Sequence, residues 1–275
     1  SSDVCSSDLG AAWLVSGQVE GAGDGYVLIV ELHDVVYGEV RERGRFRIPG
    51  QSDEGFRMAV HRASDEIVHW ATGELGMAAS RISFTMQDRE GNTDIYVVDS
   101  DGENLQRVTR HGTLTASPTW SPDGTRLVSA GGDGTVRVWN VVDSSESVVL
   151  NGHQGEVFSA VWSADGNRVA SAGMDATIRL WDPVSGDEVA EWEGAESIIL
   201  SLDAARDGNR LLAGAEDGTV RTWNLDSRSL VAINEDFSAP VNGVDWSPTG
   251  TQVAFGADDR TVQVWSPFSG EQNLV

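Results

Sequence analysis

A repeat of 42 residues governs most of this chain. Trp139, Trp181, Trp223 and Trp265 follow one another at intervals of 42 residues. A second series keeps the same step, with Asp133, Asp175, Asp217 and Asp259. A third consists of Trp120, Trp162, Ala204 and Trp246, in which one tryptophan is replaced by alanine. A period of this length restricts the chain to a fold built from stacked copies of one supersecondary unit.

Each repeat is predicted to hold four short antiparallel strands. In the copy at 151–192, β-branched or aromatic residues alternate with polar ones in four runs bounded by Asp, Gly and Ser turns, at Val157–Trp162, Arg168–Ala172, Thr177–Trp181 and Glu188–Trp192. Such alternation is typical of half-buried strands. Because a lone four-stranded meander leaves both faces uncovered, neighbouring copies must cover one another. The sequence therefore predicts an all-β protein whose main part is a β-propeller.

The repeated motifs resemble those of the WD40 repeat family. These are G-H, S-x-D-G, A-S-x-x-x-D and R-x-W-D/N, and the resemblance covers about Ala116–Val275 in four registered copies. Upstream, Arg81–Thr109 and the S-P-T-W-S-P-D-G-T-R-L of Ser117–Leu127 are similar to the propeller repeat of the TolB family. The resemblance implies about five blades, at 77–113, 114–152, 153–194, 195–236 and 237–275, which we expect to be part of a larger ring of up to seven.

The segment before the propeller, 11–76, does not share the repeat and is predicted to form a small β-sandwich. Its G-R-F-R-I-P-G and F-R-M-A-V motifs resemble the carboxypeptidase-regulatory-like fold. We expect strands within Trp13–Val19, Tyr26–Leu32, Val35–Val40, Arg45–Ile48, Phe56–His61 and Ile67–Trp70, of which the last could serve the first blade. Arg41, Arg43, Arg45 and Arg47 would line one face of a strand, as a solvated edge or as an anion or partner patch. The segment Ser1–Leu9 resembles a translated sequencing adapter, so the natural N-terminus and any signal peptide are expected to be missing.

The charge of the chain narrows the classes of partner. The formal net charge is −24, and all 19 basic residues are arginines. Such a surface is expected to repel nucleic acids and anionic lipids. The acidity fits a salty or extracellular setting and equally fits a genome-wide bias in composition, so the compartment stays open. The apolar runs are all shorter than a membrane-spanning helix requires, so no membrane span is expected.

The WD40 resemblance implies two polar networks inside the blades. In that family the repeated Trp is held by a Ser or Thr, that residue by a His, and the His by an Asp in a tight turn. By register these tetrads are His111, Ser129, Asp133 and Trp139, and His153, Ser171, Asp175 and Trp181. The last two blades carry Ala195 and Phe237 at the His position and Ala213 and Phe255 at the Ser position. We therefore expect weaker polar locking in those blades.

Neither an active site nor a metal or cofactor site is predicted. The Ser-His-Asp sets repeat between strands, whereas a catalytic triad needs one exposed nucleophile beside an oxyanion hole. Asp88, Glu90, Asn92 and Asp94 alternate, but Gly91 does not fall where an EF-hand needs it. His33, His61 and His69 lack a ligand spacing. No cofactor is therefore expected.

The family resemblance places partner binding on the top face of the propeller, where the inner strands begin. By register the candidate residues are Leu114, Glu156, Phe158, Met174, Ile198, Leu200, Glu216, Asn242 and Asp258. Phe158, Met174, Ile198 and Leu200 are residue types that anchor peptides, although some could pack on the channel wall instead. We expect a non-enzymatic scaffold that binds a protein or peptide. The alternatives are a TolB-like component of the cell envelope and, with less support, a propeller enzyme.

Overall fold

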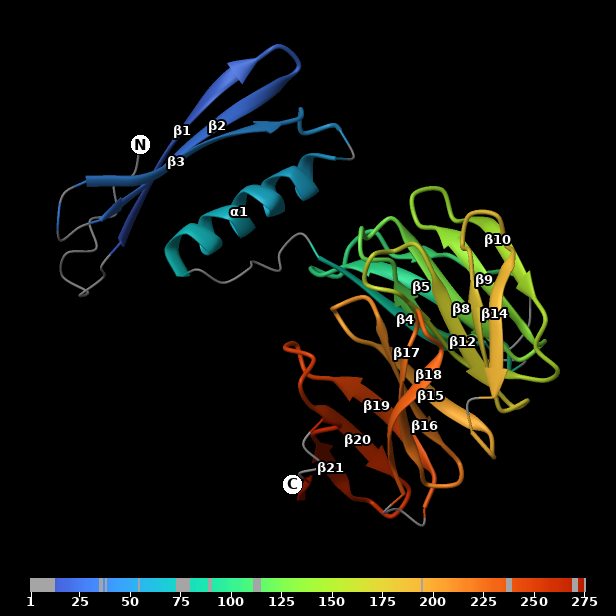
Figure 1. Cartoon of the computed structure of the whole chain (residues 1–275). Helices are drawn as coiled ribbons and strands as arrows, with labels where there is room; N and C mark the ends of the chain where they lie inside the picture. The colour runs from blue at the N-terminus through green and yellow to red at the C-terminus, as the bar shows by residue number, and fades with distance from the viewer. Residues whose placement is uncertain are drawn as a thin grey trace. The chain divides into compact units, whose positions relative to one another are not determined.

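The computed structural model describes residues 13–34, 37, 39–53, 55–72, 80–88, 91–110, 115–193, 195–235, 239–268 and 272–274. The chain divides into two compact units (Figure 1). The N-terminal unit comprises Ser1–Ile82 and Val98–Leu105, and the propeller unit comprises Ser83–Val97 and Gln106–Val275. The boundary between the units thus runs through the first sheet of the predicted propeller.

The N-terminal unit contains one antiparallel sheet and one helix. The sheet has the order β1–β2–β3, with β1 at Trp13–Ala22, β2 at Gly25–Asp34 and β3 at Glu39–Ile48. Helix α1, Phe56–Thr72, packs on β3 and β2. The Phe46 and Trp70 rings lie 5.8 Å apart. A side chain at Gly44 would collide with the Trp70 ring, because a Cβ there would lie 2.4 Å from it. Glycine on β3 therefore permits the helix to approach.

The helix corrects the predicted sandwich. The segments Phe56–His61 and Ile67–Trp70, expected to be strands, both lie in α1. Phe56, Ala63, Ile67 and Trp70 are half-buried or buried and recur at helical spacing, so they place one apolar stripe along the helix. In the described part of this unit, the sheet is covered by a helix rather than by a second sheet. The carboxypeptidase-regulatory-like resemblance stays a prediction.

The alternating arginines lie on an edge strand, as the interpretation of a solvated edge requires. β3 is at the edge of its sheet, and its arginine side chains are exposed. Arg43 pairs with Glu31 at 3.2 Å and Arg45 with Glu20 at 3.4 Å. Charged side chains on an edge strand discourage the addition of another strand.

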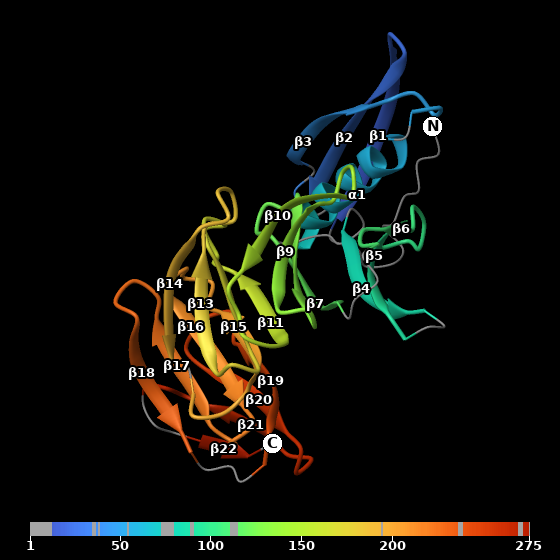
Figure 2. The same ribbon diagram turned by 90° about the vertical axis from the view of Figure 1, so that its right-hand side faces the viewer.

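The propeller is built from one three-stranded and four four-stranded antiparallel sheets, which follow one another in chain order (Figures 1 and 2). The first contains β4 (Arg81–Gln87), β5 (Thr93–Asp99) and β6 (Gln106–Arg107). The second contains β7 (Thr115–Trp120), β8 (Arg126–Gly131), β9 (Thr135–Asn140) and β10 (Ser145–Asn151). The third contains β11 (Val157–Trp162), β12 (Val169–Gly173), β13 (Thr177–Trp181) and β14 (Glu188–Glu193). The fourth contains β15 (Ile199–Ala204), β16 (Arg210–Ala215), β17 (Val220–Asn224) and β18 (Ser229–Asn234). The fifth contains β19 (Val241–Trp246), β20 (Val253–Ala257), β21 (Val262–Trp265) and β22 (Gln272–Leu274).

These sheets confirm the predicted meanders and the predicted propeller. The third sheet matches the expected strands to within one residue at each end. The first sheet lacks a fourth strand in the described residues. The segment Ile67–Trp70, considered as its possible inner strand, belongs to α1. We refer to the five sheets as blades one to five.

The repeated tryptophans occupy the seams between blades. Trp139, Trp181, Trp223 and Trp265 are only 1–4% exposed, and each lies in a separate hydrophobic cluster formed by its own blade and the preceding one. Each repeated tryptophan therefore occupies the same place in its seam. Burying about 150–250 Å² of indole contributes roughly 4–6 kcal/mol by area alone. The seams hold most of the buried apolar surface of the unit.

Contacts between arginine and tryptophan explain the repeated position that Trp162 and Trp246 occupy. The Arg126 guanidinium of blade two lies 4.6 Å from the ring centroid of Trp162 in blade three. In the same way, Arg210 of blade four lies 4.7 Å from Trp246 in blade five. At the seam between them Ala204 replaces the tryptophan, and the equivalent Arg168 forms an ion pair with Asp226 at 3.1 Å. Two of these seams thus gain a cation–π contact that the third lacks.

Candidate functional site

One complete polar tetrad is present in blade three. The indole N–H of Trp181 donates to Ser171 Oγ at 2.7 Å, and Ser171 Oγ lies 2.7 Å from His153 Nε2. His153 Nδ1 lies 2.9 Å from Asp175 Oδ2. Ser171 is fully buried and His153 nearly so. Because the Ser171 hydroxyl is closed off from solvent, this arrangement is suited to holding strands and turns together.

The tetrad also ties two loops at the top face. Asp175 Oδ2 accepts a hydrogen bond from the Gln154 amide at 2.9 Å, and Asp175 Oδ1 accepts one from Thr177 Oγ1 at 2.9 Å. Burial raises the pKa of Asp175, but the Gln154 amide and His153 outweigh this effect and leave the pKa lowered. Burial lowers the pKa of His153, against the opposing influence of Asp175. The network therefore favours a neutral imidazole beside a charged carboxylate.

The second expected tetrad is described only in part. The Trp139 indole donates to Ser129 Oγ at 2.9 Å, but His111 lies outside the described residues. Asp133 accepts from Thr135 Oγ1 at 2.7 Å and pairs with Arg137 at 2.7 Å. In blades four and five, Asp217 and Asp259 keep the equivalent bonds to Thr219 and Thr261, both at 2.6 Å. The turn is thus common to four blades. Among the described residues, only the aspartate of blade three also holds the loop that precedes its own blade.

A repeated backbone hydrogen bond brings the predicted partner-binding residues together in pairs. The amide of Met174 donates to the carbonyl of Glu156 at 2.8 Å, and that of Glu216 to the carbonyl of Ile198 at 2.9 Å. The third instance joins Asp258 to Pro240 at 2.9 Å, and the Asn242 side-chain amide donates to Asp258. Three blades therefore present these positions at the same end of their strands. Leu114 lies outside the described residues.

Exposure separates these residues into two groups. Met174 is 51% exposed, and Glu156, Glu216, Asn242 and Asp258 are exposed as well. In contrast, Phe158, Ile198 and Leu200 are half-buried. Gly155, with φ +138°, lets the loop run beside Met174, where a Cβ would lie 3.1 Å from Met174 Cβ. The top face thus combines one prominent thioether, partly accessible apolar side chains and several acidic groups.

The other sequence motifs that were considered serve local structure. The Asp88 carbonyl and side chain close a hairpin turn with Gly91 and Asn92, and Glu90 lies outside the described residues. His33 bonds to Ser16 at 2.9 Å, and His61 to Asp101 at 2.9 Å. Within the ranges that the structure describes, no three metal-ligating side chains of these types come together. No described helix is long and apolar enough to cross a membrane.

An acidic pair lies in the seam between blades four and five. Asp203 of β15 accepts a hydrogen bond from the Trp246 amide of β19 at 2.7 Å. Burial, with a further contribution from the neighbouring Asp245 carboxylate, raises the pKa of Asp203 to about 6. Because the pKa is higher in the folded than in the unfolded state, the folded protein retains the proton longer as pH rises. Stability is therefore expected to fall between about pH 4 and pH 6.

Replacing this carboxylate should stabilise the protein at neutral pH. We expect Asp203→Asn to raise the free energy of unfolding by about 1–2 kcal/mol at pH 7.5, because the amide keeps an acceptor for Trp246 without the charge. At pH 4.5 the gain should nearly vanish. Urea denaturation at both pH values would measure this, with Asp187→Asn in the exposed β13–β14 turn as the control. An equal effect of Asp203→Asn at both pH values would contradict the assignment.

Comparison with known proteins agrees with the repeat. A family model described as "WD domain, G-beta repeat" matches residues 102–140, 144–182, 186–224 and 229–266, more than half of the chain. The chain belongs to the WD40 repeat family. Each matched span begins at or just before the outer strand of one blade and ends at or just after the third strand of the next. The WD40 repeat therefore bridges two blades, whereas the predicted boundaries follow the sheets.

The curated relatives and a solved structure are TolB proteins. The chain is 37% identical over 123 residues to "Tol-Pal system protein TolB" of Methylococcus capsulatus, covering 43% of this chain and 28% of the relative. It is 30% identical over 155 residues to that of Hamiltonella defensa, covering 54% and 35%. The chain therefore spans about a third of the length of these relatives. The crystal structure of TolB from Acinetobacter baumannii aligns with TM-score 0.70 and 18% identity, over 97% of this chain and 69% of that one. The WD40 blades thus form a TolB-like propeller.

Proposed function

We propose that this protein is a non-enzymatic scaffold that binds a protein or peptide on the top face of its propeller. The match to the WD40 repeat and the similarity to TolB proteins support a binding function built on a propeller. The observation that carries the proposal is the pairing of loops at that face, where hydrogen bonds fix Met174 beside Glu156 and Glu216 beside Ile198. A rigid surface itself loses less conformational entropy when a partner binds.

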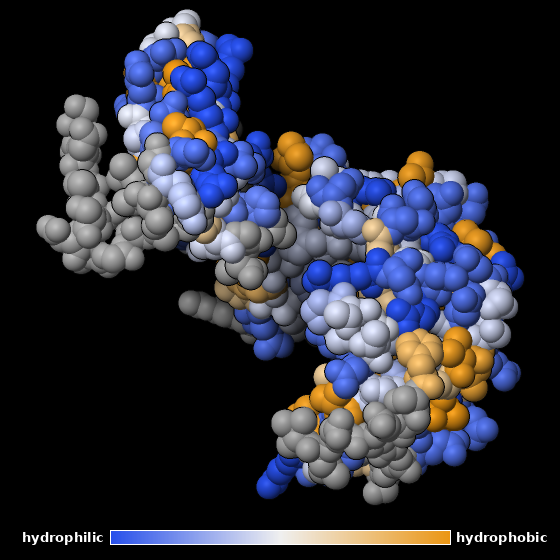
Figure 3. Space-filling model, turned by 60° about the vertical axis from the view of Figure 1, so that its left-hand side comes forward, coloured by the Kyte–Doolittle hydropathy of each residue, from blue (hydrophilic) through white to orange (hydrophobic). Residues whose placement is uncertain are grey.

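We propose Phe158 and Met174 as the centre of this site. Flexible thioethers and aromatic rings are common anchors for peptides. The face of the molecule drawn in Figure 3 is mostly hydrophilic, with hydrophobic residues in small separate patches. Apolar residues scattered singly over a surface are normal, so exposure alone does not identify a binding site. The position of the residue on the top face must support it as well. Met174 qualifies because the tetrad-bound Asp175 follows it directly.

The surrounding charge defines the partner further. Glu156, Glu216 and Asp258 are exposed around these positions, and the chain as a whole carries −24. A basic segment with at least one apolar anchor would therefore be favoured, both in its rate of association and in its specificity. The same charge disfavours nucleic acid.

Substitution at the centre of the face tests the proposal. Partners captured from the native host should lose at least tenfold in affinity for the double variant Phe158→Ala/Met174→Ala, measured by biolayer interferometry. Val142 and Val184 are 78% and 77% exposed in the turns at the opposite ends of the blades. Val142→Ala/Val184→Ala is therefore the matched control and should bind as the unmodified protein does. Equal binding by both double variants would refute the placement.

A second candidate function follows from the relatives. They are named as proteins of the Tol-Pal system, which favours a component of the cell envelope for this chain. Fractionation of the host, with detection of the tagged natural gene product, distinguishes the two. Recovery from the envelope fraction would support this function, and recovery from the cytoplasm would exclude it.

A further inference from the structure

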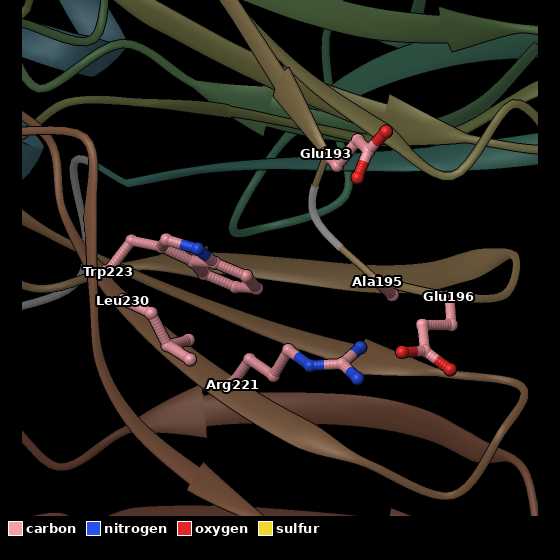
Figure 4. Close-up of a pocket in the computed structure, with 6 residues that line it drawn as sticks. All are labelled: Glu193, Ala195, Glu196, Arg221, Trp223 and Leu230. Atoms are coloured by element: carbon pink, nitrogen blue, oxygen red, sulfur yellow. The ribbon is translucent and has the colours of Figure 1, made fainter.

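A cavity of about 210 Å³ opens in the top rim of blade four. Its walls come from the last residue of β14, from residues just before β15, and from strands β17 and β18 (Figure 4). It is lined by Glu193, Ala195, Glu196, Arg221, Trp223 and Leu230. In Figure 4 the Trp223 ring, the Leu230 side chain and the Arg221 guanidinium lie on one side, facing Glu193, Ala195 and Glu196.

In blade three the equivalent place holds a carboxylate. Arg179, Trp181 and Glu188 stand 42 residues before Arg221, Trp223 and Leu230. The Glu188 carboxylate pairs with Arg179 Nη1. A Cβ on Gly152 would lie 2.7 Å from Arg179 Nη1, 3.0 Å from the Trp181 ring and 3.1 Å from Glu188 Oε2. The carboxylate thus fits between the guanidinium, the indole edge and the backbone.

Blade two contains the same pair. Arg137 Nε lies 3.2 Å from Glu146 Oε2, and Glu146 stands 42 residues before Glu188. In blade three, Glu191 contributes a second carboxylate, 2.9 Å from Arg179 Nη2. Blade four has Leu230 and Ile233 at these two positions. The outer strand therefore no longer supplies an anion to this arginine.

Arg221 has a buried hydrogen-bond donor without an acceptor, and Trp223 lacks the serine acceptor of blade three. Arg221 Nη1 is buried and has no hydrogen-bond partner among the described residues. Its ion-pair partner is Asp217, with 3.6 Å between Nη1 and Oδ2. Ala213 stands where Ser171 accepts from Trp181, so blade four has no serine at this position to accept from the Trp223 indole N–H. A buried donor without an acceptor favours a ligand that supplies one.

We propose that this cavity is a binding site for a single carboxylate group attached to a short apolar chain. The carboxylate would pair with Arg221, and the apolar atoms would contact Trp223 and Leu230. Arginine recognises carboxylates through its planar fork of donors. Glu193 and Glu196 are exposed at the rim, and their charge repels dianions and polyanions more strongly than it repels a single carboxylate. The carboxylate could come from a free short-chain acid or from a glutamate side chain of a polypeptide. The site is independent of the proposed partner site at Phe158 and Met174.

Indole NMR tests the proposal directly. Protein labelled with ¹⁵N at the tryptophan side chains is titrated with 3-methylbutanoate and with N-acetylglutamic acid α-amide, with Trp223 assigned through Trp223→Phe. We expect a saturable shift of the Trp223 Nε1–H resonance with a Kd on the order of 1–10 mM. The neutral 3-methylbutanamide and sulfate should leave the resonance unchanged. A response to both carboxylates or to the free acid supports a free ligand, and a response to the acetylglutamate alone supports a polypeptide source.

Restoring the carboxylate of the preceding blades provides the decisive variant. Leu230→Glu should occupy the cavity from within and abolish binding of both probes, whereas the neutral Leu230→Gln should still bind. Arg221→Gln should weaken binding at least tenfold. The proposal is overturned if no carboxylate gives a saturable shift, or if Leu230→Glu binds as tightly as Leu230→Gln.

Discussion

Replacing Trp181 by alanine is expected to destabilise the propeller by about 3–5 kcal/mol, the range measured for buried large side chains. Trp181 is 1% exposed and packs in one cluster with Val128, Val138 and Leu150 of the preceding blade. Its loss would leave a cavity in a seam and deprive Ser171 of its indole donor. Urea denaturation followed by circular dichroism would show a lower midpoint.

The control for this change is a tryptophan of the same blade outside the seam tetrad. Trp192 lies on the outer strand β14, is only half-buried, and its indole nitrogen has no hydrogen-bond partner in the described part of the chain. Trp192→Ala should cost clearly less, under about 2 kcal/mol. Trp192 packs only at the margin of the next seam, so equal losses for the two variants would mean that full burial and the tetrad add no stability at Trp181.

The propeller could be predicted from the sequence because each blade repeats the same physical requirement. A buried indole at the same place in every repeat demands a neighbouring sheet to cover it, and four copies fix the register of every strand between them. Alternation then places the strands to within a residue in blade three. The same reasoning fails in the N-terminal unit, where no repeat constrains the register. There the apolar runs in Phe56–Thr72 fit either periodicity when taken in short pieces, and only the whole 17-residue segment shows a helix.

The cavity of blade four was not predicted because it arises where polar side chains of blade three are replaced by apolar ones. Motif analysis searches for residues that are present, whereas this site arises from Leu230 and Ala195 standing where blade three has Glu188 and His153. The signal was nevertheless available. Comparing each position with its counterpart in the preceding repeat shows an arginine kept while the carboxylates of the outer strand are lost. The alanines at 195 and 213 predict a weaker tetrad. Whether they also leave an open cavity depends on how the neighbouring side chains pack, which the motif does not indicate.

Ser171→Ala tests the tetrad that supports the top face. Ser171 Oγ contacts both the Trp181 indole and His153 Nε2 at 2.7 Å and is fully buried. Alanine would leave two buried polar groups unsatisfied, so we expect a loss of about 2–3 kcal/mol in the free energy of unfolding. The matched control is Ala213→Ser, which offers the Trp223 indole an acceptor and should be neutral or stabilising by up to about 1 kcal/mol.

The pH dependence of this variant separates a polar network from simple packing. Because burial lowers the pKa of His153 in the folded state, the unfolded state binds its proton first, and stability falls as pH drops below about 6.5. Ser171→Ala frees His153 Nε2, so the loss of stability between pH 7 and pH 5.5 should change in size. The tetrad would not be coupled if Ser171→Ala cost no more at pH 7 than an ordinary surface substitution, or left this pH dependence untouched. If the tetrad is coupled, Asp175 should hold the Gln154 loop less firmly in the Ser171→Ala variant. A partner bound at the proposed site beside Met174 should then dissociate faster, although the substitution changes no residue of that site.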